Sequence, residues 1–148
     1  MAEGDGAVYQ VAKADFLKAD IDLVDDTIKV GLVGGYTLDE DGHTTWTAVK
    51  SAATGGELSG TGYSAGGATL ASNSVTATGT GTGTTVKGKF DADNVTWSSV
   101  SCGTPSHAVM YDDTHTAKHV IAAWEVTTAT NGGNYTLTWN ASGIITIS

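Results

Sequence analysis

Alternating apolar and polar residues in the middle of the chain predict three short β-strands. Residues 86–90 place their apolar side chains on one face and two lysines on the other, which is the period-2 pattern of a half-buried strand. Residues 95–100 and 108–111 form the second and third strands. The segments 91–94 and 102–106 have the composition of turns. The pattern therefore predicts an antiparallel meander made of two consecutive hairpins.

The same alternation recurs on both sides of this meander. Residues 27–33 and 119–126 are the strongest of the outer strands, and both faces of the second are apolar, which predicts a central or interfacial position. Residues 72–77, 135–139 and 144–147 form three further strands. About eight short strands separated by turns predict an all-β fold, either an antiparallel β-sandwich or a jelly-roll-like barrel.

Helical periodicity is scarce. Residues 10–19 are the best helical candidate, and residues 43–53 fit either a short helix or irregular packing, so we expect at most one short helix. The length of 148 residues predicts one β-sandwich domain over residues 12–148. Residues 1–11 have too few apolar side chains to fold alone and predict a mobile N-terminal arm.

Composition and charge narrow the function classes. The chain has 20 glycines and a formal net charge of −9, and the negative charge argues against a nucleic-acid partner because phosphate binding needs a surface of Lys and Arg. A single cysteine cannot form an internal disulfide. No run of 18 apolar residues is present, and the N-terminus has no secretory pattern, so we expect neither a membrane span nor export by a signal peptide.

Metal sites are not favoured by the spacing of the possible ligands. His115 and His119 are four residues apart, which brings two side chains together on a helix, but they follow a turn-then-strand pattern and need not face each other. Aspartates cluster at residues 20–26, 39–41 and 91–93, and none of these clusters matches an EF-hand loop. We interpret them as turn-forming residues and expect no metal and no cofactor.

Enzymatic motifs are also missing from the sequence. Ser64 lies in a Gly-Tyr-Ser-Ala-Gly segment within a glycine loop, which lacks the strand-to-helix turn of a hydrolase nucleophile. The Gly/Thr run at residues 78–85 has no following helix to bind phosphate, and predicts a hairpin loop or a weakly specified edge strand. The four tryptophans could form a sugar-stacking platform, but three of them sit on the alternating face of predicted strands, which favours the core. We expect no catalytic residue.

Several segments taken together resemble a family of small virion proteins of tailed bacteriophages. The two most specific are Gly-Thr-Gly-Tyr-Ser-Ala-Gly-Gly at residues 60–67 and Phe-Asp-Ala-Asp-Asn-Val-Thr-Trp at residues 90–97. The other segments are residues 16–33, 109–113 and 135–147. The resemblance implies a non-enzymatic capsid decoration (cement) protein that binds the major capsid protein on the capsid exterior and stabilises the head. The alternative is a tail, fibre or baseplate component, with or without a glycan-binding role.

Two segments are candidate contacts with other subunits in such a particle. The first is the end of the N-terminal arm, which could add as a strand to an open sheet edge of a neighbour. The second is the flat Gly/Thr run. We also expect a homo-oligomer, and specifically a trimer, because the resemblance implies a decoration protein and such proteins often trimerise at symmetry points. The candidate contact residues are Ala7, Val8, Tyr9, Gln10, Val11, Thr80, Thr82 and Thr84.

Overall fold

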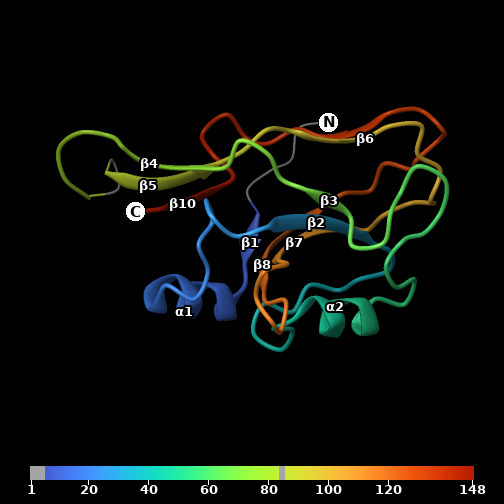
Figure 1. The fold of residues 1–148 in the computed structure, drawn as a ribbon, viewed down its shortest axis with the longest axis horizontal. Helices are drawn as coiled ribbons and strands as arrows, with labels where there is room; N and C mark the ends of the chain where they lie inside the picture. The colour runs from blue at the N-terminus through green and yellow to red at the C-terminus, as the bar shows by residue number, and fades with distance from the viewer. Residues whose placement is uncertain (1–5, 84–85) are drawn as a thin grey trace.

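The computed structural model describes residues 6–83 and 86–148, which form ten strands and two helices. All strand pairs are antiparallel, and they build one sheet of five strands, one of three and one of two (Figure 1). The all-β fold class is therefore confirmed. The elements are β1 (Ala7–Val8), α1 (Gln10–Lys18), β2 (Ile28–Val33), α2 (Trp46–Ala52), β3 (Ala68–Thr69), β4 (Ser74–Thr78), β5 (Lys87–Asp91), β6 (Val95–Trp97), β7 (His107–Asp112), β8 (Val120–Glu125), β9 (Tyr135–Leu137) and β10 (Ile145–Ile147).

The five-stranded sheet, in the order β1-β8-β7-β2-β3, forms the centre of the molecule. Strands β2, β7 and β8 bury side chains on both faces, as the two apolar faces of residues 119–126 predict for a central strand. Figure 1 shows both helices on one side of this sheet and the two smaller sheets on the other. The core therefore fills the space on both faces of the central sheet.

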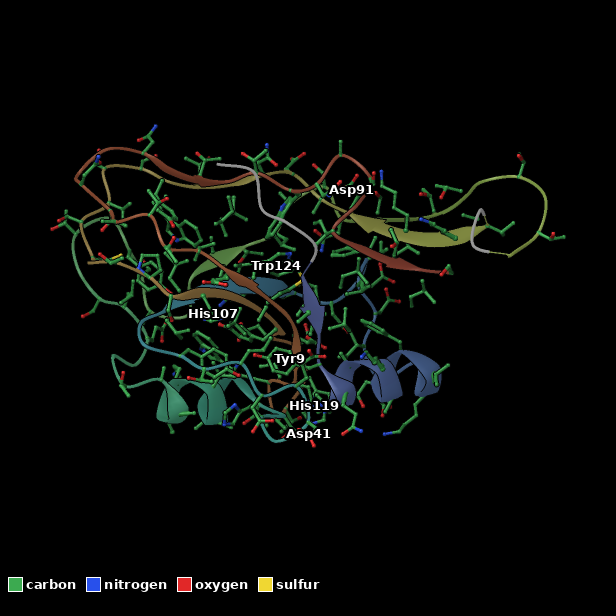
Figure 2. The ribbon with its side chains drawn as sticks, turned by 180° about the vertical axis from the view of Figure 1, so that it is seen from behind. Tyr9, Asp41, Asp91, His107, His119 and Trp124 are labelled. Atoms are coloured by element: carbon green, nitrogen blue, oxygen red, sulfur yellow. The ribbon has the colours of Figure 1, made fainter. Side chains whose placement is uncertain are left out.

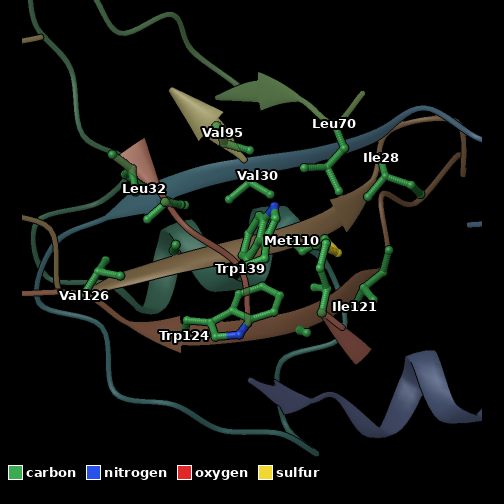
Figure 3. Packing of buried hydrophobic residues seen from close by; sticks show 14 of the residues in the cluster. Ile28, Val30, Leu32, Leu70, Val95, Met110, Ile121, Trp124, Val126 and Trp139 are labelled. Carbon is green, nitrogen blue, oxygen red and sulfur yellow. The ribbon is translucent and has the colours of Figure 1, made fainter. Parts of the chain in front are cut away.

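On the helix side, the packing is organised around Trp46 of α2. Its indole stacks on Tyr111 with ring centroids 4.9 Å apart and an angle of 5° between the planes. A Cβ at Gly31 would lie 2.6 Å from the Trp46 ring, so the absence of a side chain at Gly31 lets the indole approach β2. On the opposite side, Trp124 and Trp139 pack together with centroids 5.0 Å apart, beside Val30 and Met110 (Figure 3).

Two helices are present, so the expectation of at most one short helix is wrong. Helix α1 occupies the predicted position and ends at Lys18, because the next residue, Ala19, has left-handed backbone geometry at φ 59°. Helix α2 begins after Thr45, whose side-chain oxygen accepts a hydrogen bond from the Ala48 amide at 3.1 Å. Trp46 and Val49 lie three residues apart on one face of α2, and their burial stabilises a helix too short to be stable alone.

The predicted meander exists as strands but not as hairpins. Its three strands are β5, β6 and β7, and each belongs to a different sheet, because β5 pairs with β4 and β10, β6 pairs with β9, and β7 pairs with β2 and β8. The connecting backbone bonds to distant segments, since the Asp93 amide donates to the Ala71 carbonyl and the Val100 amide donates to the Gly133 carbonyl. The prediction of two consecutive hairpins is therefore wrong.

The N-terminal arm is also different from its prediction within the described residues. Ala7 and Val8 form β1, which pairs with Ala123 and Ala122 of β8 in the same chain. Tyr9 is fully buried, and its hydroxyl lies 2.9 Å from that of Tyr36 (Figure 2). Residues 7–9 are thus ordered by the chain's own sheet, which supplies the backbone partners and apolar contacts that the local sequence lacks. Residues 1–5 lie outside the described residues.

Candidate functional site

The three-stranded sheet, in the order β10-β5-β4, has one apolar and one polar face. Its register places Val75, Phe90 and Ile145 in one cross-strand row, and Ala77, Gly88 and Ile147 in a second row on the same face. The opposite face carries Thr76, Lys89 and Thr146. Because the apolar rows point toward α1, the sheet and the helix form the two walls of an apolar cleft.

The cleft is only partly filled by the protein's own side chains. Phe90 and Ile145 are 2% and 6% exposed, whereas Val75 and Ile147 on the same face are 54% and 61% exposed. On the opposite wall Leu17 is 91% exposed. Two adjoining hollows of about 370 and 340 Å³ share Phe16, Ile145 and Ile147. We call this feature the apolar cleft, and define it by the side chains Val8, Phe16, Leu17, Ile21, Leu23, Val24, Val75, Phe90, Ile145 and Ile147.

Large exposed apolar side chains gather at this cleft. The described residues include five, and four of them line it: Leu17, Val24, Val75 and Ile147. The fifth is Val86, which immediately precedes β5. Scattered single apolar side chains are normal on a protein surface, whereas a contiguous group marks a surface that another molecule covers. The cleft is therefore the strongest candidate binding site in the described part of the chain.

Both outer strands of the three-stranded sheet are open edges. Within the described residues, β4 and β10 each pair with β5 alone, and all five residues of β4 are exposed. The sequence has no charged side chain between Glu57 and Lys87, and none after Glu125. Its one proline, Pro105, lies elsewhere. These edges therefore lack the charges and prolines by which proteins usually prevent strand addition.

The predicted subunit contacts lie in two separate places. Val8 lines the apolar cleft, and Gln10 and Val11 begin α1 beside it. Ala7 pairs with β8, and the Tyr9 hydroxyl contacts that of Tyr36. Thr80 and Thr82 lie in the exposed loop of the β4–β5 hairpin, at the outer end of the molecule (Figure 1). Thr84 lies outside the described residues. The predicted hairpin loop at the Gly/Thr run is thus confirmed, and its role in contacts stays a prediction.

The two histidines face each other, although their turn-then-strand pattern did not require it. The His115 and His119 rings stack with centroids 3.9 Å apart, because the turn between β7 and β8 folds back on itself. Nδ1 of His119 lies 2.5 Å from Oδ2 of Asp15, a carboxylate that is 1% exposed. This contact connects α1 to the β7–β8 turn across 104 residues of sequence. It holds the helical wall of the apolar cleft in place.

The aspartate clusters shape turns, as predicted. Oδ1 of Asp22 accepts hydrogen bonds from the amides of Val24 and Asp25, and these bonds lower the pKa of the Asp22 carboxyl. Oδ1 of Asp39 accepts from the Gly42 amide at 2.9 Å. Over residues 6–83 and 86–148, no three His, Cys, Asp or Glu side chains are arranged to hold a metal ion.

The aromatic residues belong to the core. The four tryptophans are between 2% and 6% exposed, and the five tyrosines are between 0% and 8% exposed. The predicted burial of the tryptophans is confirmed, and no tryptophan or tyrosine ring presents an exposed face for stacking on a sugar. Hydrogen bonds also fix some of these rings, since the Tyr63 hydroxyl donates to Oε1 of Glu57 and accepts from the Leu32 amide.

Neither helix of the described chain has the length and apolar composition needed to cross a membrane. Comparisons with protein-family models, with curated proteins and with solved structures found no match.

Proposed function

We propose that this protein is a non-enzymatic structural component of a tailed-bacteriophage virion, and specifically a capsid decoration protein that stabilises the head. The proposal is supported by the resemblance of residues 16–33, 57–70, 90–98, 109–113 and 135–147 to such virion proteins. The observation that carries it is the apolar cleft with its two open, uncharged sheet edges. These features suit a protein that acts by packing against other polypeptides.

The physical basis is the free energy gained when the uncovered apolar surface is buried in an assembly. Each fully buried Val, Leu or Ile side chain contributes about 1.5–3 kcal/mol relative to its exposed state. Leu17, Val75 and Ile147 are all more than half exposed in the single chain. Assembly of many copies on a lattice would bury these side chains. The free energy gained by burying them would drive both the binding of the protein and the stabilisation of the particle.

Cryo-electron microscopy of the source virion tests the proposed location. We expect density for this fold on the outside of the head, in contact with the major capsid protein. Density confined to the tail or baseplate would overturn the decoration assignment and place the protein among tail components.

Co-sedimentation provides a second test in solution. The purified protein should sediment with particles of its own phage from which it has been stripped, and should raise the temperature at which those heads release DNA. Particles of an unrelated phage serve as the control. Equal sedimentation with both particles would contradict specific decoration.

A further inference from the structure

We propose that the apolar cleft is filled by a second copy of this chain, whose β4 edge adds as a strand to the β10 edge. The contact joins two different edges of the three-stranded sheet, β10 of one copy and β4 of the next. The inference concerns contacts between copies and does not depend on the particle that the protein joins.

The geometry of the cleft favours a strand as its occupant. One hollow is bounded by Phe16 and Leu17 of α1 on one side and by all three residues of β10 on the other. A strand placed along β10 would continue the three-stranded sheet and gain main-chain hydrogen bonds. Because side chains alternate along a strand, every second residue of the added strand would point under α1.

Strand β4 has the sequence that this position requires. Its residues alternate Ser, Val, Thr, Ala, Thr, and all five are exposed. Val75 and Ala77 share one face, so in the neighbouring copy they would enter the cleft beside Leu17. The three hydroxyl side chains of Ser74, Thr76 and Thr78 would stay on the solvent face. The pairing thus covers the apolar side chains of both partners without burying a hydroxyl group.

The distribution of charge explains why two acidic copies can meet at this place. Each copy has a net charge of −9, so most of their surfaces repel one another. Strands β4 and β10 lie in the two long uncharged stretches, before Lys87 and after Glu125. Of the charged side chains that line the cleft, Lys13 stands against Asp22 alone, since the Lys89 side chain lies on the opposite face of the sheet and pairs with Asp91. Repulsion between copies is therefore lowest where these two edges would meet.

The proposed contact is heterologous, because it joins two unlike surfaces. Such contacts propagate until the rotation between neighbours closes a ring, or else they form an open filament. In a ring each copy donates one β4 edge and receives another, so that no open edge of the three-stranded sheet remains.

The full chain and three lysine variants test the inference by light scattering and sedimentation across a concentration series. Leu17→Lys places a charge on the cleft, and Ala77→Lys places one on the entering strand; both sites are exposed, so both variants should fold. The wild type should reach a multiple of 15.0 kDa, and each variant should associate at least about tenfold more weakly. Thr76→Lys is the matched control, because it adds the same charge to β4 on the solvent face and should associate like the wild type.

Mixing the variants tests the head-to-tail arrangement. The Leu17→Lys copy keeps an intact β4, and the Ala77→Lys copy keeps an intact cleft, so together they should form a dimer that neither forms alone. Circular dichroism confirms that each variant is folded.

Three results would overturn the inference: a wild type that remains a 15.0 kDa monomer throughout the series, an Ala77→Lys variant that associates normally, or a mixture without dimers. The second result would mean that a different segment, or a different protein, fills the cleft. A monomeric wild type that still sediments with its phage particles would leave the decoration function standing, so the two proposals can fail separately.

Discussion

The five-stranded and three-stranded sheets have the same alternating chemistry but different surroundings. In the central sheet, Val30 of β2 and Val109 of β7 point to opposite faces, and both are 0% exposed because packed layers cover both sides. In the three-stranded sheet, Val75 and Ile147 belong to an apolar face of the same kind, yet both are more than half exposed. The comparison separates residues that stabilise the fold from residues that are available for binding.

This difference follows from how many other elements pack against the faces of each sheet. The central sheet has helices on one face and the two smaller sheets on the other (Figure 1). The three-stranded sheet has only α1 and the segment after it, and these cover its inner row, Phe90 and Ile145, but not its outer residues. Substitutions in the core of the central sheet should therefore lower the stability of the fold, whereas substitutions at the apolar cleft should not. Four predictions follow, and the first and the last test this comparison directly.

The largest effect is expected at Trp124 in the central sheet. The side chain is 4% exposed and packs on Trp139 (Figure 3), so Trp124→Ala removes contacts and leaves a cavity. We expect the free energy of unfolding to fall by about 3–5 kcal/mol in chemical denaturation. An unchanged midpoint of denaturation would show that Trp124 does not belong to a packed core.

The second prediction compares two glycines with similar backbone geometry. Gly67 has φ +78°, and a Cβ there would lie 1.9 Å from the Val30 carbonyl oxygen of the central sheet. Gly132 has φ +86° and nothing within 4 Å of such a Cβ. Gly67→Ala should therefore cost about 2–4 kcal/mol, because the clash adds to the strained backbone. Gly132→Ala should cost only about 1–2 kcal/mol. Equal losses in thermal or chemical unfolding would contradict the close approach at Gly67.

The third prediction uses two neighbouring carboxyls at the end of β7, which should respond to pH in opposite directions. Lys118 and Lys29 donate to Asp113 and lower its pKa below the usual 3.8, so its stabilising effect is present above that value and is lost as the pH falls through the lowered pKa. Burial and the nearby Asp26 carboxylate raise the pKa of Asp112, so its contribution is lost as the pH rises above 3.8 through the raised pKa.

Asparagine variants measured by urea unfolding at acidic and neutral pH test these signs. Asp113→Asn should lower stability at pH 7 by about 0.5–1 kcal/mol and have little effect below the lowered pKa. Asp112→Asn keeps an oxygen that can accept from the amides of Thr114 and His115, and should raise stability at neutral pH. Shifts of the same sign in both variants would show that the two carboxyls share one environment.

The smallest effect on folding is expected at the apolar cleft. Leu17 is 91% exposed, so Leu17→Ser should change the free energy of unfolding by no more than about 0.5 kcal/mol. The measurement should be made at a concentration at which the protein is monomeric. If association buried Leu17, the measured free energy of unfolding would include the effect of the substitution on association. A loss comparable to that of Trp124→Ala would remove the distinction between the two sheets.

The existence of the strands could be predicted because alternation is a local property. Strands of the structure overlap all eight predicted ranges, which are residues 27–33, 72–77, 86–90, 95–100, 108–111, 119–126, 135–139 and 144–147. The two additional strands, β1 and β3, have only two residues each. The burial of Trp97, Trp124 and Trp139 followed from the same local pattern, and the aspartate turns at Asp22 and Asp39 followed from their turn-forming residue type. The candidate site could be predicted only in part. The sequence pattern showed the apolar face of residues 86–90, but it did not show that the rest of the chain leaves part of this face exposed.

Tertiary structure alone decided which strands pair, because an apolar face of a strand fits many partners and loop-closure entropy differs little between short and long connections. Strands β5, β6 and β7 are consecutive in sequence and lie in three sheets, while β10 pairs with β5 from the far end of the chain. Likewise, Ala7 and Val8 are ordered by β8, and His119 faces Asp15 only because the fold brings α1 to the β7–β8 turn. Strands β4 and β10 have open edges because, within the described residues, no further strand pairs with either of them.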